Sequence, residues 1–212
     1  MARGFFSLQP TTVMSYTLEH SRTMAAYNSL KSRLEDATPD EWHRGVTWYP
    51  RANAIAVRHA RSFGLPVSDV SGVIAALSPL TPWDDNLDAA EALLNGNDAQ
   101  LQRLHGLSRN QAKARRIAFG GEPAADVLSG SKVLGFHFSI MLRPGAVCID
   151  RHIWNAVKRF GLASQVPTAN ARRAIERAFR MLASEYQVPT YALQAVVWIV
   201  QRSIMKHTPY DF

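Results

Sequence analysis

The spacing of apolar residues is helical over almost the whole chain. Apolar positions recur every three or four residues, and the alternation typical of a β-strand never lasts beyond a few residues. The pattern predicts helices at residues 17–36, 50–63, 67–77, 84–94, 98–104, 108–118, 132–142, 150–160, 168–185 and 190–205. Short helices joined by short loops are typical of a compact all-α domain.

Several helix ends carry their own signals. Ser68, Ser108 and Thr168 are expected to cap the helices that follow them, because a hydroxyl oxygen can accept a hydrogen bond from the first turn. The pairs Asn95–Gly96 and Gly120–Gly121 are expected to end helices, since these residues tolerate the left-handed backbone of a C-cap. The last helix is apolar on most sides and is therefore predicted to lie at the centre of the fold.

Composition excludes several classes of protein. With 212 residues, 47% of them hydrophobic, the chain can bury a core without disulfides, and we interpret residues 1–212 as one domain. The single cysteine, Cys148, excludes a disulfide framework and a four-cysteine metal or iron–sulfur site, and it fits a reducing cytoplasm. No His/Cys cluster has zinc spacing, so we expect neither a catalytic metal nor a cofactor. The longest apolar run, 195–200, is too short to span a membrane.

The charge is positive and unevenly distributed. The chain has 24 Lys and Arg against 17 Asp and Glu, a net charge of +7. Residues 1–106 hold 9 basic and 11 acidic side chains, whereas residues 107–212 hold 15 basic and 6 acidic ones. A basic half beside a nearly neutral half suggests a polyanionic partner, although a solvated basic surface would give the same numbers.

The segment 128–154 carries the residues that suggest chemistry. A turn of small residues, Ser129–Gly130–Ser131, precedes a helix with Lys132 in its first turn, and the free N–H groups at such a helix start can bind a phosphate. Asp150 opens a later helix. Aspartate is also a favoured N-cap, and the local sequence by itself favours capping over catalysis.

The combination of this turn, the lysine, a Pro-Gly loop and an Asp-Arg-His sequence resembles the helix-hairpin-helix (HhH-GPD) DNA glycosylase superfamily. The resemblance implies that Gly130 belongs to a hairpin that grips a DNA phosphate. It also implies that Lys132 is the nucleophile of members that cleave the strand, and that Asp150, in Ile149–His152, is the catalytic carboxylate. It covers roughly residues 67–161, and leaves 1–66 and 162–212 as packing helices around a glycosylase-like core.

A second segment, 72–86, is similar to the early apolar helix of that superfamily and to the loop after it. There the loop supplies a side chain that wedges into the base stack, and Leu80 or Thr81 is the nearest candidate. The chain also departs from the pattern, because its hairpin is shorter than the usual Pro-Gly-x-Gly-x. Its Ser-Pro-Leu-Thr-Pro-Trp loop is more similar to phage- and actinobacteria-associated relatives, among them amino acid:DNA transferases that modify thymine derivatives.

The remaining expectations concern a base pocket and a DNA-binding surface. An enzyme that acts on a base in duplex DNA must flip it out, and Trp83, Phe136 and Trp154 are expected to contact the flipped base, although each aromatic side chain taken alone is more typical of a core. The residues expected to contact DNA are Ser129, Gly130, Ser131, Arg109, Lys113, Arg115, Arg116, Leu80, Thr81, Arg151 and His152.

These observations leave three alternative functions. The first is a DNA glycosylase that uses Asp150, either with or without strand cleavage through Lys132. The second is a phage DNA hypermodification transferase that acts on a hydroxymethyluracil-derived base. The third is a catalytically inactive DNA-binding protein. We expect double-stranded DNA as the partner, no membrane, a monomer, and the cytoplasm as the location, which is the bacterial host's if the chain is phage-encoded.

Overall fold

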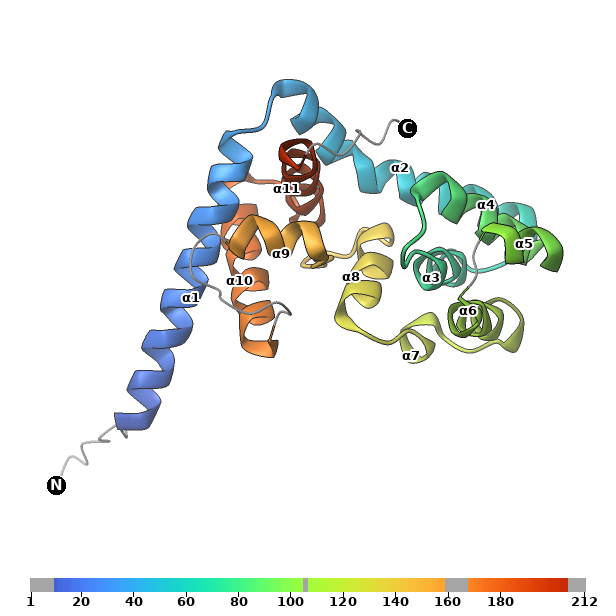
Figure 1. Ribbon diagram of the computed structural model, residues 1–212, viewed down its shortest axis with the longest axis horizontal. Helices are drawn as coiled ribbons and strands as arrows, with labels where there is room; N and C mark the ends of the chain where they lie inside the picture. Colours follow the sequence, from blue (N-terminus) through green and yellow to red (C-terminus); the bar gives the residue numbers. More distant parts are fainter. Residues whose placement is uncertain (1–9, 105–106, 159–167, 206–212) are drawn as a thin grey trace, which may run out of the picture.

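Helices form all the regular structure of residues 10–104, 107–158 and 168–205, the part of the chain that a computed structural model describes (Figure 1). The all-α prediction is therefore confirmed. The helices are α1 (Pro10–Glu35), α2 (Pro39–Phe63), α3 (Val67–Leu77), α4 (Trp83–Leu94), α5 (Asp98–Leu104), α6 (Ser108–Gly120), α7 (Ala124–Val127), α8 (Ser131–Ile140), α9 (Arg151–Lys158), α10 (Ala169–Tyr186) and α11 (Thr190–Ile204).

Some of the predicted helix ends are confirmed and others are wrong. The Thr168 hydroxyl accepts from the backbone N–H of Ala171 at 3.2 Å and caps α10, and Gly121 ends α6 in the left-handed conformation. In contrast, Ser68 and Ser108 do not cap. Their helices begin after Pro66 and Leu107 without a side-chain cap, because each serine lies one or two residues inside the helix instead of at the flanking position.

Helix α2 is the largest departure from the prediction, which placed a helix only at 50–63. The helix starts at Pro39, where Thr38 and Glu41 form a reciprocal capping box, and Pro50 lies inside it. An interior proline removes one backbone hydrogen bond and costs about 3 kcal/mol in a solvated helix. Here α2 packs along α11, α3 and α8, and this burial offsets that cost.

Three smaller differences complete the comparison. Helix α1 starts at Pro10, earlier than the predicted residue 17. The short helix α7 was not predicted, since four residues carry no helical period. The predicted end of the helix at 150–160 falls among residues outside the described part of the chain.

Two hydrophobic clusters form the core, and α11 contributes to both. One cluster is built mainly by α2 to α8, and the other by α1, α9, α10 and α11. Ala195 belongs to the first cluster and Val196 to the second. Helix α2 crosses above both groups in Figure 1, and Gly45 allows it to approach the backbone of α11 at Val196. The prediction of a central last helix is confirmed. None of the described helices is long and apolar enough to cross a membrane.

Helix α8 lies at the junction of the two clusters and is fixed from two sides. A Cβ atom on Gly135 would lie 2.3 Å from the carbonyl oxygen of Val147, so only glycine allows the run 146–150 before α9 to pack this closely on α8. On its other side, His137 is buried and its Nδ1 lies 3.0 Å from the Ser71 hydroxyl of α3. Together these contacts fix α8 relative to α3 and to the residues that lead into α9.

Candidate functional site

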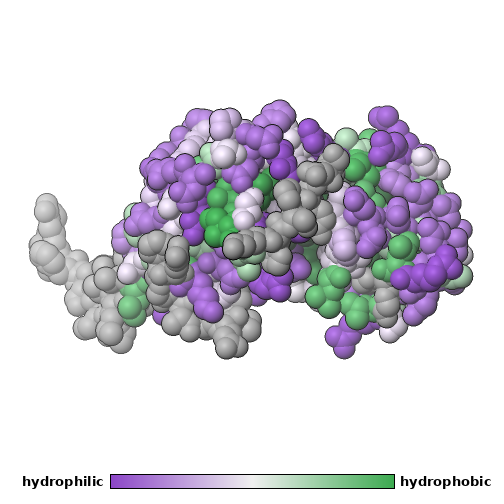
Figure 2. Space-filling model, turned by 45° about the horizontal axis from the view of Figure 1, so that its top comes forward, coloured by the Kyte–Doolittle hydropathy of each residue, from purple (hydrophilic) through white to green (hydrophobic). Residues whose placement is uncertain are grey.

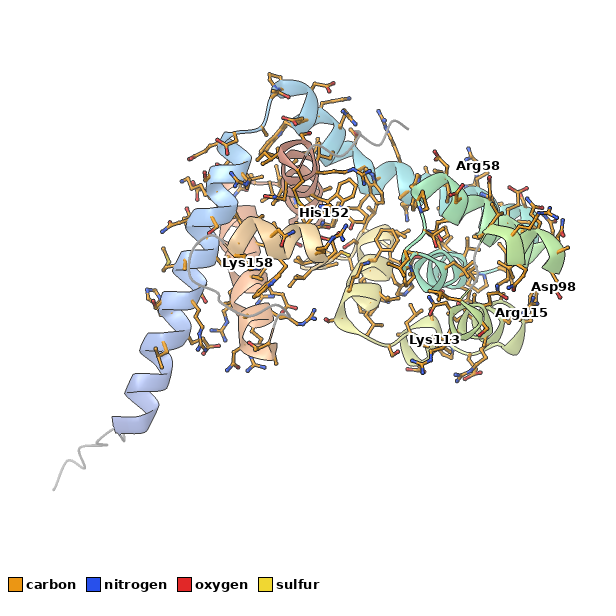
Figure 3. All side chains as sticks on the ribbon, viewed as in Figure 1. Arg58, Asp98, Lys113, Arg115, His152 and Lys158 are labelled. Atoms are coloured by element: carbon orange, nitrogen blue, oxygen red, sulfur yellow. The ribbon has the colours of Figure 1, made fainter. Side chains whose placement is uncertain are left out.

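A cavity of about 490 Å³ lies between the two hydrophobic clusters. Its lining comes from α2, the 78–82 loop, the first turn of α4, α8, residues 148–152 and α11. These segments are far apart in the sequence. Figure 3 shows His152, one of the lining residues, on α9 near the centre of the molecule. The cavity is therefore a product of the tertiary fold.

Four of the aromatic side chains that line this cavity form one group of neighbouring rings. The ring of Trp48 lies with its centroid 5.0 Å from that of Trp83, 4.7 Å from Tyr49 and 5.9 Å from Phe136. Trp48 and Tyr49 come from α2, Trp83 from α4 and Phe136 from α8. Aromatic rings of this kind provide a surface on which a flat heterocycle can stack.

Asp150 lines the cavity and accepts three hydrogen bonds. Its Oδ1 accepts from the backbone N–H groups of His152 at 2.9 Å and Ile153 at 3.0 Å, and its Oδ2 accepts from the indole of Trp198 at 2.9 Å. The first two bonds cap α9, as the local sequence predicted. The third connects the carboxylate to α11. Asp150 is thus held in one orientation by two helices while it faces the cavity.

Lys132 and Arg151 line the same cavity and are exposed to solvent, so both cations lie at its edge. Cys148 lies deeper. Burial, together with the Asp150 carboxylate, raises the pKa of the Cys148 thiol far above its ordinary value, so the thiol stays protonated. The lining of the cavity therefore combines one carboxylate with cations at the rim. Within the described ranges, no three His, Cys, Asp or Glu side chains gather as a metal site requires.

The loop between α3 and α4 carries an unusual leucine. Leu80 is 93% exposed and has a φ of 64°, in the left-handed region that leucine rarely adopts. Leu80 and Thr81 both line the cavity. Figure 2 shows that hydrophobic patches interrupt an otherwise hydrophilic face of the molecule. A strained backbone that holds an apolar side chain in solvent beside a cavity is typical of a functional position.

The turn at residues 129–131 lies at the start of α8, next to Lys132. Gly130 has a φ of 87°, and no side chain in the described part of the chain caps the helix, so its first-turn N–H groups have no side-chain acceptor there. Two cations from other helices reach this turn: Lys113 of α6 donates to the Ser129 hydroxyl at 2.5 Å, and Arg172 of α10 donates to the Ser131 hydroxyl. This arrangement can bind an anion at the edge of the cavity.

The other basic residues of α6 are arranged differently. Arg115 forms an ion pair with Asp98, which lies at the start of α5 (Figure 3), and Arg116 forms one with Glu122. Arg109 is exposed near the start of the helix. Only Lys113 of this group contacts the 129–131 turn in the described part of the chain. The four expected DNA contacts of α6 are thus not equivalent.

Not all of the predicted base-pocket residues line the cavity. Trp83 and Phe136 line the cavity, whereas Trp154 is buried in the second hydrophobic cluster and does not line it. Trp154 faces that cluster because α9 buries one face there and turns its first residues to the cavity. Several lining residues were not predicted from the sequence, namely Trp48, Tyr49, Asn86, Gln194, Trp198 and Arg202.

Two features of the sequence could have predicted some of these lining residues. Thr38–Pro39–Asp40–Glu41 has the form of a capping box with proline at the first helical position, and it predicts the half of α2 that carries Trp48 and Tyr49. Gln194 and Trp198 lie four residues apart, and therefore on one face, in an otherwise apolar helix.

Comparison with known proteins adds a family but no activity. No curated protein and no solved structure matches the chain. One family model, described as a family of unknown function (DUF7178), matches residues 14–205, which include all the lining residues of the cavity. The chain therefore belongs to the DUF7178 family.

Proposed function

We propose that this protein is a DNA-binding enzyme with a glycosylase-like core, which flips a base into the cavity and excises it with Asp150. The observation that carries the proposal is the convergence of Asp150, Lys132 and an aromatic surface on one cavity, from segments far apart in the sequence. The resemblance of residues 67–161 to helix-hairpin-helix glycosylases supports the same reading.

Asp150 would act on the sugar. When the glycosidic bond breaks, its electron pair leaves with the base and positive charge develops on the sugar. A carboxylate that is already oriented by three hydrogen bonds stabilises this charge without having to reorganise, and water completes the reaction at C1′. Aromatic rings beside it would hold the flipped base.

The surface around the cavity has parts that suit a bent and opened duplex. Leu80 is an exposed apolar side chain at the cavity and can fill the space that a flipped base leaves in the stack. The 129–131 turn, with Lys113 and Arg172, can contact a phosphate. The contacts to the flipped base, to the base stack and to the DNA backbone would then lie on one continuous surface.

Lys132 adds strand cleavage to the proposal. As a free amine, its Nζ would form a bond to C1′ while the base leaves, and the ring-opened adduct is an iminium that sodium borohydride reduces to a stable amine. Because Lys132 is exposed, excision with water as the nucleophile is the simpler reaction, and strand cleavage is a separate expectation.

The test combines product analysis with trapping. The protein is incubated with duplexes that contain modified or mismatched bases, and the reaction is analysed by mass spectrometry of bases and nucleosides. Release of a free base that disappears in Asp150→Asn supports the proposal. A borohydride adduct that is lost in Lys132→Ala but kept in Lys158→Ala supports strand cleavage, since Lys158 is an exposed lysine that does not line the cavity.

Other outcomes would overturn it. A nucleoside of increased mass, with no released base, would indicate the base-modifying transferase on the same scaffold. DNA binding with no product on any modified duplex would favour the inactive DNA-binding protein. Binding that is equally strong at low and high salt would contradict phosphate contacts.

A further inference from the structure

Asn86 is a buried polar residue of the cavity that the proposed reaction does not use. It lies in the first turn of α4, is 1% exposed and lines the cavity. Its Nδ2 donates to the carbonyl oxygen of Ile74 on α3 at 3.2 Å. Because a carbonyl can only accept, this bond fixes which end of the amide faces α3, and it leaves Oδ1 as a pure acceptor.

This acceptor has no donor in the described part of the chain. Asn86 Oδ1 is shielded from solvent and receives no hydrogen bond from the residues that the structure describes. A buried carbonyl oxygen without a donor is costly, and such groups are rare in folded proteins. A ligand that brings an N–H group to this position would remove the cost.

The other carboxylate and amide oxygens of the lining are already occupied. Asp150 accepts three hydrogen bonds, and the Gln194 Oε1 accepts from the Tyr49 hydroxyl at 2.8 Å. Cations line the same cavity, because Lys132 and Arg151 lie at its rim, where both are exposed and can donate. Among the carboxylate and side-chain amide oxygens of the lining, Asn86 Oδ1 is thus the one without a donor in the described part of the chain.

We infer that Asn86 selects a base with an imide edge, of the uracil or thymine type, by accepting a hydrogen bond from its N3–H. Such a base has one N–H between two carbonyl oxygens, which matches one acceptor among several donors. Cytosine and adenine present an amino group with two N–H bonds and would leave one of them without a partner here. This inference rests on the proposed function, since the base comes from DNA.

The experiment uses the full chain and short duplexes with one unpaired base, which can leave the stack without breaking a pair. Affinity is measured by fluorescence anisotropy for thymine, uracil, N3-methylthymine, cytosine and an abasic site at that position. We expect thymine and uracil to bind about tenfold more tightly than N3-methylthymine or cytosine, which is the effect of one buried hydrogen bond. In Asn86→Leu this preference should disappear while the affinity for the abasic duplex stays unchanged.

N3-methylthymine keeps the test decisive if Asn86→Leu does not fold. Its methyl group replaces the N3–H of the ligand and leaves the protein unchanged. Equal affinity for all duplexes would overturn the inference and leave the proposed function intact. Failure to bind any duplex, the abasic one included, would overturn the proposed function. Free thymidine that competes as well as the thymine duplex would place the imide ligand outside DNA and overturn the inference as stated.

Discussion

Helices α8 and α9 begin close to the same cavity, and their N-termini are built in opposite ways. Helix α9 starts after Asp150, whose carboxylate accepts from two N–H groups of the first turn. Helix α8 starts after Gly130 without a side-chain cap, and Lys113 and Arg172 reach the residues beside it. Both N-termini carry partial positive charge. The N-terminus of α9 is neutralised by the protein's own carboxylate, whereas no side chain in the described part of the chain caps that of α8.

The largest effect, a loss of turnover, is expected when the negative charge of Asp150 is removed. Asn caps a helix about as well as Asp, so Asp150→Asn should change the free energy of unfolding by less than about 1 kcal/mol. Loss of the negative charge should lower turnover by roughly 100-fold or more. Urea titration and a base-release assay measure the two quantities separately. Unchanged turnover would show that Asp150 is a cap and nothing more.

The next effect concerns the contact that joins α8 to the approach of α9. Gly135→Ala should lower the free energy of unfolding by about 2–3 kcal/mol, because the added methyl group overlaps the Val147 carbonyl. Displacement of the run before Asp150 should reduce turnover as well. Gly120→Ala is the matched control, since a Cβ there meets nothing closer than 3.7 Å. Similar thermal unfolding temperatures for the two variants would contradict the close contact.

A third prediction concerns pH and the other side of α8. Burial, together with the nearby Arg143 charge, lowers the pKa of His137 to about 4, compared with an ordinary value of 6.5. The unfolded chain therefore takes up a proton at a higher pH than the folded one. Stability is fully present above pH 6.5 and is lost as the pH falls towards 4, with a decrease of about 2 kcal/mol between pH 7 and pH 5.

Urea titrations at several pH values measure this loss, and His137→Gln provides the comparison. The variant removes the titrating group, so its stability should decrease less over the same interval. Parallel pH profiles for the two proteins would show that another group is responsible.

A smaller effect is expected at the open N-terminus of α8. Arg172→Ala should weaken DNA binding several-fold and lower the slope of log affinity against log salt by about 1, the value for one phosphate contact. Arg173→Ala is the control on the same helix, because Arg173 bonds to Asn170 and does not reach the turn. Equal slopes for the two variants would contradict a phosphate-binding site at the start of α8.

The last prediction concerns Leu80, where the effect on stability has the opposite sign to that of Gly135→Ala. Glycine adopts a φ of 64° without strain, so Leu80→Gly should raise the free energy of unfolding by about 1 kcal/mol. If Leu80 fills the space of a flipped base, the same change should lower base release. A more stable variant with full activity would show that this leucine has no part in the reaction.

The contrast between α8 and α9 also shows how far local sequence can be interpreted. The capping role of Asp150 was predictable, because it depends on residues two and three positions away. The bond from Trp198 was not, since that residue is 48 positions distant. Similarly, the turn at Gly130 suggested a free helix start, but nothing local indicated that Arg172 would reach it.

Helix α2 shows why an element itself can be missed. Pro50 carries the strongest local signal against a helix interior, and its cost is overcome only by packing along α11, α3 and α8. Placing the helix start at residue 50 removed Trp48 and Tyr49 from the predicted elements. Two of the aromatic residues of the cavity were therefore lost with one helix boundary.

The sequence by itself determined the all-α class, most helix positions, and the proximity of Lys132 and Asp150 to helix starts. These properties depend on periodicity and on contacts within one helical turn. Only the tertiary structure decided that Asp150, Asn86 and the aromatic residues line one cavity, and that Trp154 does not. The reason is physical: each helix can present any of its faces to a neighbour, and the choice is made by packing between segments far apart in the chain.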